Sequence, residues 1–193
     1  MKNKVIGTTT MKKYLTSFFL FMLILGKLHG QTDFTKPEDT LTILEHPSSF
    51  SDLIKQFKGK VIYIDIMTSW CKPCIQELKI SKGLDEFFAK ENIVKLYISI
   101  DNFGQTDRAL EILKTENIKG YFVTYRAPDG KPNQFATDLE NLFLFDSKKQ
   151  FRGIPIYAIV DKQGTLITND AKRPSSGEDL KKQLQKSNNS QIR

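Results

Sequence analysis

The chain has few of the residues that staple or cross-link small protein domains. Among its 193 residues are two cysteines, Cys71 and Cys74, and one histidine after residue 30, His46. A disulfide between cysteines so close in sequence removes little chain entropy from the unfolded state, so it would stabilise the fold only slightly. A structural zinc site needs about four ligands, and these three residues fall short of that number. The shortage favours a chemical role for the two sulfurs.

The chain also lacks an apolar run long enough to cross a bilayer as a helix. The run YLTSFFLFMLIL, Tyr14 to Leu25, follows Lys12 and Lys13. Its length of about a dozen residues fits the core of a signal peptide and is short of the ~17–25 residues of a membrane span. We therefore expect residues 1–30 to be an export signal, with Met11 as an alternative start. The alternative is an uncleaved membrane tether, since Lys27 interrupts the run without forbidding an anchor.

No excess of one charge extends along the chain. The formal net charge is +7, but residues 1–30 contribute five lysines and no acid, so the remaining chain is nearly balanced. Its basic residues are interspersed with acidic ones, which argues against nucleic-acid binding. The length after residue 30 suits one domain with its own core. We expect a lead-in at 31–48, a single domain at 49–188 and a tail at 189–193.

Two strongly apolar strand patterns are present, and a helical pattern follows each of them. Val61–Ile66 and Ile93–Ile100 lack polar alternation, which is typical of strands covered on both faces. Helical spacing follows in Ile75–Asn92, with a break near Gly83, and in Asp107–Lys114. This order predicts an α/β fold with parallel pairing and right-handed crossovers. Two short elements are expected before them, a strand at Thr42–Leu44 and a helix at Ser51–Phe57.

The second half of the chain is less regular. Gly120–Gln150 shows a turn pattern, APDG, and a helical pattern around Thr137–Phe143. After it, Ile154–Val160 and Thr165–Thr168 are apolar runs joined by the turn sequence DKQG, which predicts an antiparallel hairpin.

A closing helix is expected at the end of the chain, in SSGEDLKKQLQ. Ser175 and Glu178 have the spacing of a capping box in front of it. We therefore expect these two side chains to satisfy each other's backbone amides at the helix start.

The two cysteines lie between the first apolar strand and the helix after it, in SWCKPCIQEL. Unpaired amides and the dipole at a helix start favour negative charge, so we expect a lowered pKa for the Cys71 thiol, with Lys72 adding a nearby cation. Pro73 is tolerated in a first helical turn. Cys74 lies one turn further in and should be more buried. Cys71 is therefore predicted to attack a partner disulfide, and Cys74 to resolve the mixed disulfide.

Two acids are candidates for taking the proton of the inner thiol, which must ionise in a desolvated place. Asp65 lies on the otherwise apolar strand, where a charge is costly without a role or a partner. Glu77 lies three residues after Cys74 and so on the same helical face. The alternative for Asp65 is a hydrogen-bonded structural acid. For Glu77, it is a solvated acid in the first turn of the helix.

Three motifs together resemble the thioredoxin superfamily. They are FKGKVIYID, which carries Asp65, then WCKPCIQE, and then GIPIYAIVDKQG. The pattern C-x-P-C-x-x-E and the export signal are similar to the TlpA/ResA-type extracytoplasmic thiol-disulfide oxidoreductases. The likeness covers roughly Phe50–Lys186. It implies a thioredoxin-like α/β fold, in which helices flank a central mixed β-sheet in a single domain.

The resemblance also implies roles for individual residues. Cys71 would be the nucleophile and Cys74 the resolving thiol, with Asp65 as the buried acid and Glu77 as the acid after the motif. Pro155 would be a cis-proline that packs against the disulfide and helps to bind the substrate. The other residues assigned to substrate binding are Trp70, Lys72, Pro73 and Ile154. On the sequence alone, Trp70 suits a core position equally well.

The chain departs from the family pattern at three places. Met67 stands where many relatives have an aromatic residue, and Lys79 stands where a proline is often found. Gly120–Gln150 is longer than the corresponding part of a minimal thioredoxin. These differences leave the sulfur chemistry in place and bear on the choice of partner.

The predicted function is disulfide exchange with protein substrates. The protein would act as a reductant, and a thiol electron donor would supply its electrons. We expect a periplasmic or secreted monomer without cofactor or metal. It would contact the membrane only through an uncleaved leader. One alternative is a disulfide-forming oxidase, since Lys72 would stabilise the reduced thiolate. Another is a copper(I)-handling protein, because thiolates suit that ion, but the chain lacks the C-x-x-x-C spacing and a histidine after His46. The last is a non-catalytic module with a vestigial cysteine pair.

Overall fold

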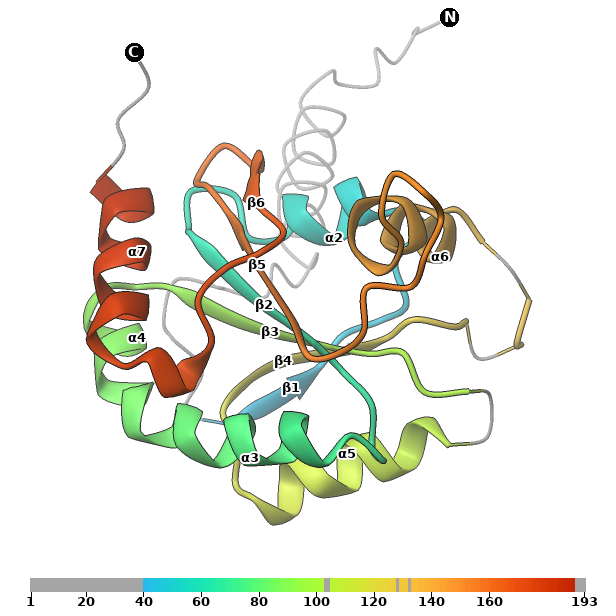
Figure 1. Cartoon of the computed structure of the whole chain (residues 1–193), viewed down its shortest axis with the longest axis horizontal. Helices are drawn as coiled ribbons and strands as arrows, with labels where there is room; N and C mark the ends of the chain where they lie inside the picture. Colours follow the sequence, from blue (N-terminus) through green and yellow to red (C-terminus); the bar gives the residue numbers. More distant parts are fainter. Residues whose placement is uncertain (1–39, 103–104, 128, 132, 190–193) are drawn as a thin grey trace, which may run out of the picture. The chain divides into compact units, whose positions relative to one another are not determined.

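One mixed sheet organises the chain in the computed structural model (Figure 1), which describes residues 40–102, 105–127, 129–131 and 133–189. The predicted export signal lies outside these residues. The strand order is β1-β4-β3-β2-β5-β6. Pairing is parallel from β1 through β4 and β3 to β2, and antiparallel from β2 to β5 and from β5 to β6. The strands are β1 (Leu41–Ile43), β2 (Ile62–Met67), β3 (Val94–Ser99), β4 (Gly120–Thr124), β5 (Ile156–Val160) and β6 (Leu166–Thr168).

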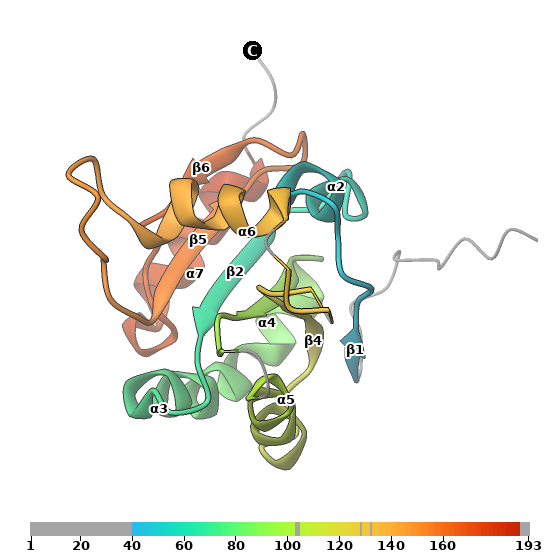
Figure 2. The same ribbon diagram turned by 90° about the vertical axis from the view of Figure 1, so that its right-hand side faces the viewer.

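Helices cover both faces of the sheet. Figure 2 shows α2 and α6 on one side of the strands and α3 and α5 on the other. The apolar residues of α4 and α7 pack on the same face as α3 and α5. No helix in the described part of the chain is long and apolar enough to span a membrane. The helices are α2 (Phe50–Lys55), α3 (Lys72–Ser81), α4 (Asp85–Lys90), α5 (Thr106–Thr115), α6 (Gln134–Leu139), α7 (Glu178–Asn189), a π-helix (Glu140–Leu144) and two 3-10 helices (Lys82–Leu84 and Pro174–Ser176).

Strand β2 is buried along its whole length, as its run of apolar residues without polar alternation predicts. Successive side chains of a strand point to opposite faces of the sheet. Ile62, Ile64 and Ile66 join the core under α2 and α6. Tyr63 and Met67 join the core on the opposite face, and Asp65 lies between them in the alternation. The one acid of this strand is therefore on the face that carries α3.

Most of the predicted elements form, with small shifts of their ends. The two apolar runs become β2 and β3 and pair in parallel. The expected hairpin forms from β5 and β6. The 3-10 helix Lys82–Leu84 separates α3 from α4 where the sequence indicates a break near Gly83. The α/β class and the mixed central sheet are thus confirmed.

Two elements in the second half of the chain differ from the expectation. Strand β4 lies between β1 and β3, in a segment whose sequence gave no strand prediction. Helix α6 begins at Gln134, before the expected start, because the Asn133 side chain caps it by accepting a bond from the Ala136 amide at 2.9 Å.

The predicted capping box before α7 is wrong. Ser175 lies in the 3-10 helix Pro174–Ser176, and its hydroxyl donates to Glu77 at 2.7 Å instead of capping α7. A spacing rule considers only local partners, whereas here a carboxylate from α3 competes for the serine.

Gly120, the first residue of β4, is a site where a side chain should be costly. Its φ is +132°, and an added Cβ would lie 2.6 Å from the backbone oxygen of Lys95. We expect Gly120→Ala to lower the free energy of unfolding by about 2–4 kcal/mol, from backbone strain and overpacking. Chemical denaturation of the purified protein measures this. Gly83→Ala is the matched control, because an added Cβ there meets nothing within 4 Å. Equal losses in the two variants would contradict the steric explanation.

Candidate active site

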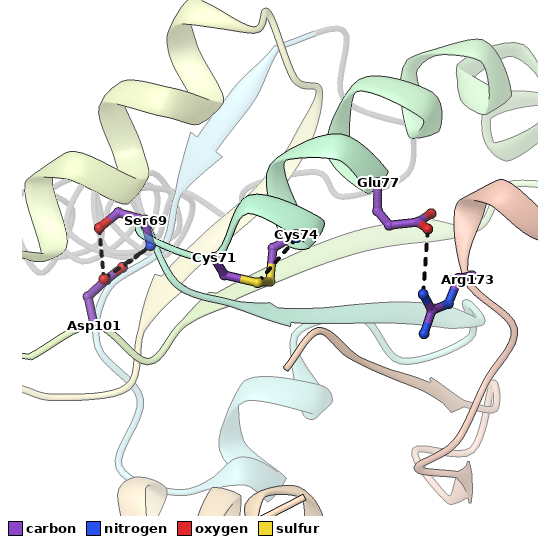
Figure 3. Close-up of a disulfide and its surroundings, with 6 residues drawn as sticks. All are labelled: Ser69, Cys71, Cys74, Glu77, Asp101 and Arg173. Carbon is purple, nitrogen blue, oxygen red and sulfur yellow. Dashed lines mark hydrogen bonds and ion pairs between the residues drawn. A yellow bond between two sulfur atoms is a disulfide. The ribbon is translucent and has the colours of Figure 1, made fainter. Parts of the chain in front are cut away.

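The two cysteines form a disulfide at the junction between β2 and α3 (Figure 3). Cys71 is the N-cap residue of α3, and its Sγ accepts a hydrogen bond from the Cys74 amide at 3.2 Å. Pro73 lies in the first turn, where its missing amide hydrogen breaks no helical bond. Cys71 retains 5% exposure and Cys74 none. The predicted inequality of the two sulfurs is therefore present in the structure.

This placement favours negative charge on the outer sulfur. The first amides of a helix lack intrahelical acceptors, and one of them already points at Cys71 Sγ. After reduction the same amide would stabilise a Cys71 thiolate over the thiol. Lys72 is exposed directly beside it. Cys74 is enclosed by apolar side chains of β2, β3 and α5, which favour its uncharged form.

Asp65 is a buried acid on the face of the sheet that α3 covers. It is 2% exposed, and its Oδ1 has no hydrogen-bond partner in the described part of the chain. Tyr97 and Tyr157 are its neighbours on the adjacent strands. Burial, and then the charge of Glu77, raise the pKa of Asp65 well above its usual value. The structure therefore does not support the alternative of a fully hydrogen-bonded structural acid.

Glu77 is also buried, at 6% exposure, and is not the solvated acid of the alternative interpretation. Its two carboxylate oxygens accept bonds from the Ser175 amide at 2.8 Å and the Ser175 hydroxyl at 2.7 Å. Arg173 Nη1 lies 3.9 Å from Glu77 Oε1, and Figure 3 shows the two side chains pointing toward each other. Glu77 thus ties α3 to the segment before α7, and places a fixed negative charge near Asp65.

Asp101 is a third buried acid, which the sequence analysis missed. It is 1% exposed and follows the end of β3. Its carboxylate accepts bonds from the Ser69 amide at 2.9 Å, the Ser69 hydroxyl at 2.8 Å and the Ser99 hydroxyl at 2.7 Å. This anchor fixes the backbone two residues before Cys71 (Figure 3). The sequence does contain a signal for Asp101, because it is a polar residue just after β3. The carboxyl ends of neighbouring parallel strands meet at one edge of the sheet, so a residue there can reach the segment that follows β2.

The proline loop, formed by Ile154 and Pro155, lies beside the cysteines, as the family resemblance implies. The Ile154–Pro155 peptide bond is cis. Ile154 packs against the cluster that contains Cys71 and Cys74. Trp70 is 65% exposed, so it belongs to the surface of the site and not to the core. Lys72 and Pro73 are exposed as well, so the first turn of α3 offers a surface to a partner.

Comparison with known proteins agrees with this geometry. The chain matches the Redoxin family over residues 32–184. The crystal structure of a candidate thiol-disulfide oxidoreductase from Bacteroides vulgatus is 27% identical, with a TM-score of 0.51 over 68% of this chain and 80% of that one. No curated protein matches significantly.

Two further structures share the fold at lower identity. A candidate thiol:disulfide interchange protein DsbE from Chlorobium tepidum is 20% identical, with a TM-score of 0.50 over 70% of this chain and 84% of that one. A thioredoxin-like protein from Porphyromonas gingivalis is 19% identical, with a TM-score of 0.51 over 70% of this chain and 80% of that one. At these identities the likeness concerns the fold alone.

The strand order, the sulfur pair at the start of α3 and the nearby proline loop place the protein in the thioredoxin superfamily. Its match to one family model extends over most of the sequence. The chain belongs to the Redoxin family. It is a thiol-disulfide oxidoreductase with Cys71 and Cys74 as its cysteine pair.

The buried Asp65 should make stability fall as the pH rises. Because its pKa is raised in the folded state, the folded protein binds more protons than the unfolded chain above about pH 4, and stability declines toward neutral pH. We expect Asp65→Asn to raise the free energy of unfolding of the oxidised protein at pH 7, on the order of 1–3 kcal/mol, and to change it little at pH 3.

Denaturant unfolding at several pH values measures this effect. Asp107→Asn removes an exposed acid from the first turn of α5 and serves as the charge control. It should leave the pH profile nearly unchanged. A loss of stability in Asp65→Asn at pH 7 would show that the ionised carboxylate has a stabilising partner and would contradict the assignment of Asp65 as a destabilising buried charge.

Proposed function

We propose that this chain is an extracytoplasmic reductant of protein disulfides. The observation that carries the proposal is the position of Cys71, whose sulfur accepts the Cys74 amide at the N-cap of α3. The apolar run after Lys12 and Lys13 supports export, because its length and flanking charge suit a signal peptide. The natural substrates are then protein disulfides, and a separate thiol donor restores the dithiol.

The reaction begins with the dithiol form. The Cys71 thiolate attacks one sulfur of the substrate disulfide, forms a mixed disulfide and releases the first substrate thiolate. The Cys74 thiolate then attacks Cys71 Sγ and releases the second. Two electrons pass from the cysteine pair to the substrate, and the enzyme is left with the Cys71–Cys74 disulfide seen in the structure.

The second step requires Cys74 to lose a proton in a site without solvent. Asp65 suits this task, because on the face that α3 covers its Oδ1 has no partner in the part of the chain that the structure describes, and its pKa is raised. We assign Asp65 as the proton acceptor. Glu77 has both oxygens engaged by Ser175. Its contribution is to raise the pKa of Asp65 and to fix α3, so it acts through Asp65.

The substrate is proposed to bind across the surface formed by the proline loop and the start of α3. Ile154 and Pro155 are partly exposed, and the backbone before a cis-proline at the start of β5 is open to an extended segment. The exposed ring of Trp70 provides apolar contact on the other side of the sulfurs. Lys72 and Pro73 complete this surface.

Trapping of mixed disulfides tests the two sulfur roles. We expect Cys74→Ser to accumulate covalent complexes with its partners through Cys71, because the resolving thiol is missing. Cys71→Ser should form none, since Cys74 is fully buried. Alkylation-quenched extracts of the native host, separated under non-reducing conditions and identified by mass spectrometry, provide the measurement. Trapping by Cys71→Ser alone would reverse the assignment.

The direction of electron flow is tested by the reduction potential. We expect a value nearer ~−270 mV, as in reducing thioredoxins, than ~−120 mV, as in strong oxidants. Equilibration of the protein against a dithiothreitol or glutathione series measures it. The same measurement applies to Lys72→Gln. Loss of the cation should destabilise the reduced Cys71 thiolate and so lower the reduction potential further. A wild-type value close to that of strong oxidants would favour the disulfide-forming alternative.

A further inference from the structure

A polar groove of about 430 Å³ begins at the proline loop. It is lined by Pro155 and Tyr157 on one side and by residues of the segment after β6 on the other. The amide of Ala171 in that segment donates to the Tyr157 carbonyl at 2.9 Å, so the groove follows the start of β5. Two of its residues also belong to the site described above: Pro155 at its entrance, and Arg173, which pairs with Glu77.

Positive charge predominates in this groove. Arg152, Lys172 and Arg173 line it, against one acid, Asp170. All four side chains belong to exposed residues. Within the described part of the chain, Lys172, Arg152 and Asp170 form no ion pair. Arg173 pairs with Glu77, so the excess positive charge of the groove, among the described residues, comes from Arg152 and Lys172 against Asp170.

The cations differ in how firmly they are held. The Arg152 guanidinium donates to the carbonyls of Phe143 at 3.3 Å and Asn169 at 3.0 Å, which fix its position without cancelling its charge. Arg173 Nη1 is 3.9 Å from Glu77 Oε1, a loose pair that leaves donors free. A guanidinium held in place by neutral carbonyls is well suited to bind a carboxylate.

From this geometry we infer that the groove binds an acidic segment of the protein substrate, next to the disulfide that is reduced. The inference rests on the proposed function, in which an extended substrate segment docks at Ile154 and Pro155. A segment that continues from there along β5 enters the groove. Carboxylates on one face of that segment would then meet Arg152 and Lys172, so the preferred substrates carry Asp or Glu close to the reactive cysteine.

Charge complementarity of this kind acts mainly on the rate of association and is weakened by salt. The test uses two disulfide peptides that differ only in the residues flanking the disulfide, glutamate in one and lysine in the other. We expect the protein to reduce the acidic peptide about 3- to 10-fold faster at low salt, with the difference shrinking at high salt.

Variants locate the effect. Lys172→Glu should abolish or reverse the preference, and Asp170→Asn should increase it, because each changes the charge of the groove alone. Lys90→Glu alters an exposed lysine of α4 and is the matched control for net charge. It should keep the wild-type preference. Reduction of a neutral disulfide should be the same in all of these proteins, which shows that each is folded and active.

A binding measurement separates failure of this inference from failure of the proposed function. Peptides with serine in place of cysteine are titrated against the oxidised protein, so that no exchange occurs. The groove is supported if the acidic peptide binds more tightly and this advantage is lost in Lys172→Glu but kept in Lys90→Glu. That conclusion holds even if neither disulfide peptide is reduced. A failure to reduce both peptides would overturn only the proposed reductant function. Equal binding of both peptides, or equal effects of the two lysine variants, overturns the groove and leaves the reductant unaffected.

Discussion

The chemistry of this protein depends on where the chain places the Cys71 sulfur relative to the first amides of α3. The sulfur accepts the Cys74 amide at 3.2 Å, so charge that develops on it meets a donor already in position. This donor is fixed because the buried strand β2 ends at Met67 and Cys71, four residues later, caps α3. Without that junction, the same two cysteines would be an ordinary short-range pair.

Three buried acids surround the junction, each with a different arrangement. Asp101 is saturated by serine donors and holds the chain just before the cysteines. Glu77 is saturated by Ser175 and holds α3 against the segment before α7. Asp65 retains one oxygen, Oδ1, without a partner among the described residues. Two of the acids therefore fix the backbone around the cysteines, and the third, Asp65, is the one whose pKa burial raises.

The sequence predicts those parts of the fold that local pattern determines. The mainly apolar runs without polar alternation identify β2 and β3, and the kink expected at Gly83 falls in the 3-10 helix that follows α3. The position of the sulfurs at a helix start follows from the apolar run before SWCKPC and the helical spacing after it. Strand β4 escapes detection, because Gly120–Thr124 is short and depends for its stability on pairing with β3 and β1.

The site is predictable to the extent that its residues belong to one continuous motif. Cys71, Cys74, Asp65 and Glu77 lie within thirteen residues of one another, and each has a recognisable chemical signature. Asp101 and Ser175 have no such signature, because each contributes to the site through a partner that is distant in sequence. The partner of Asp101 is 32 residues away, and that of Ser175 is 98 residues away. The capping-box error has the same origin: the local partner of Ser175 was visible in the sequence, whereas the distant carboxylate that it binds was not.

The separation of the site into two stretches of chain has a consequence for how such a protein can diverge. The sulfurs and their acids lie before the middle of the domain, whereas the proline loop and the cations beside it lie in residues 152–173. The later stretch contains β5, which pairs with β2 along its length, so that strand belongs to the frame of the site. The groove cations Arg152 and Lys172 are exposed and lie outside this pairing. Under the proposed function, substitution at these exposed positions can alter which protein substrates bind while the cysteine pair and its frame are inherited intact.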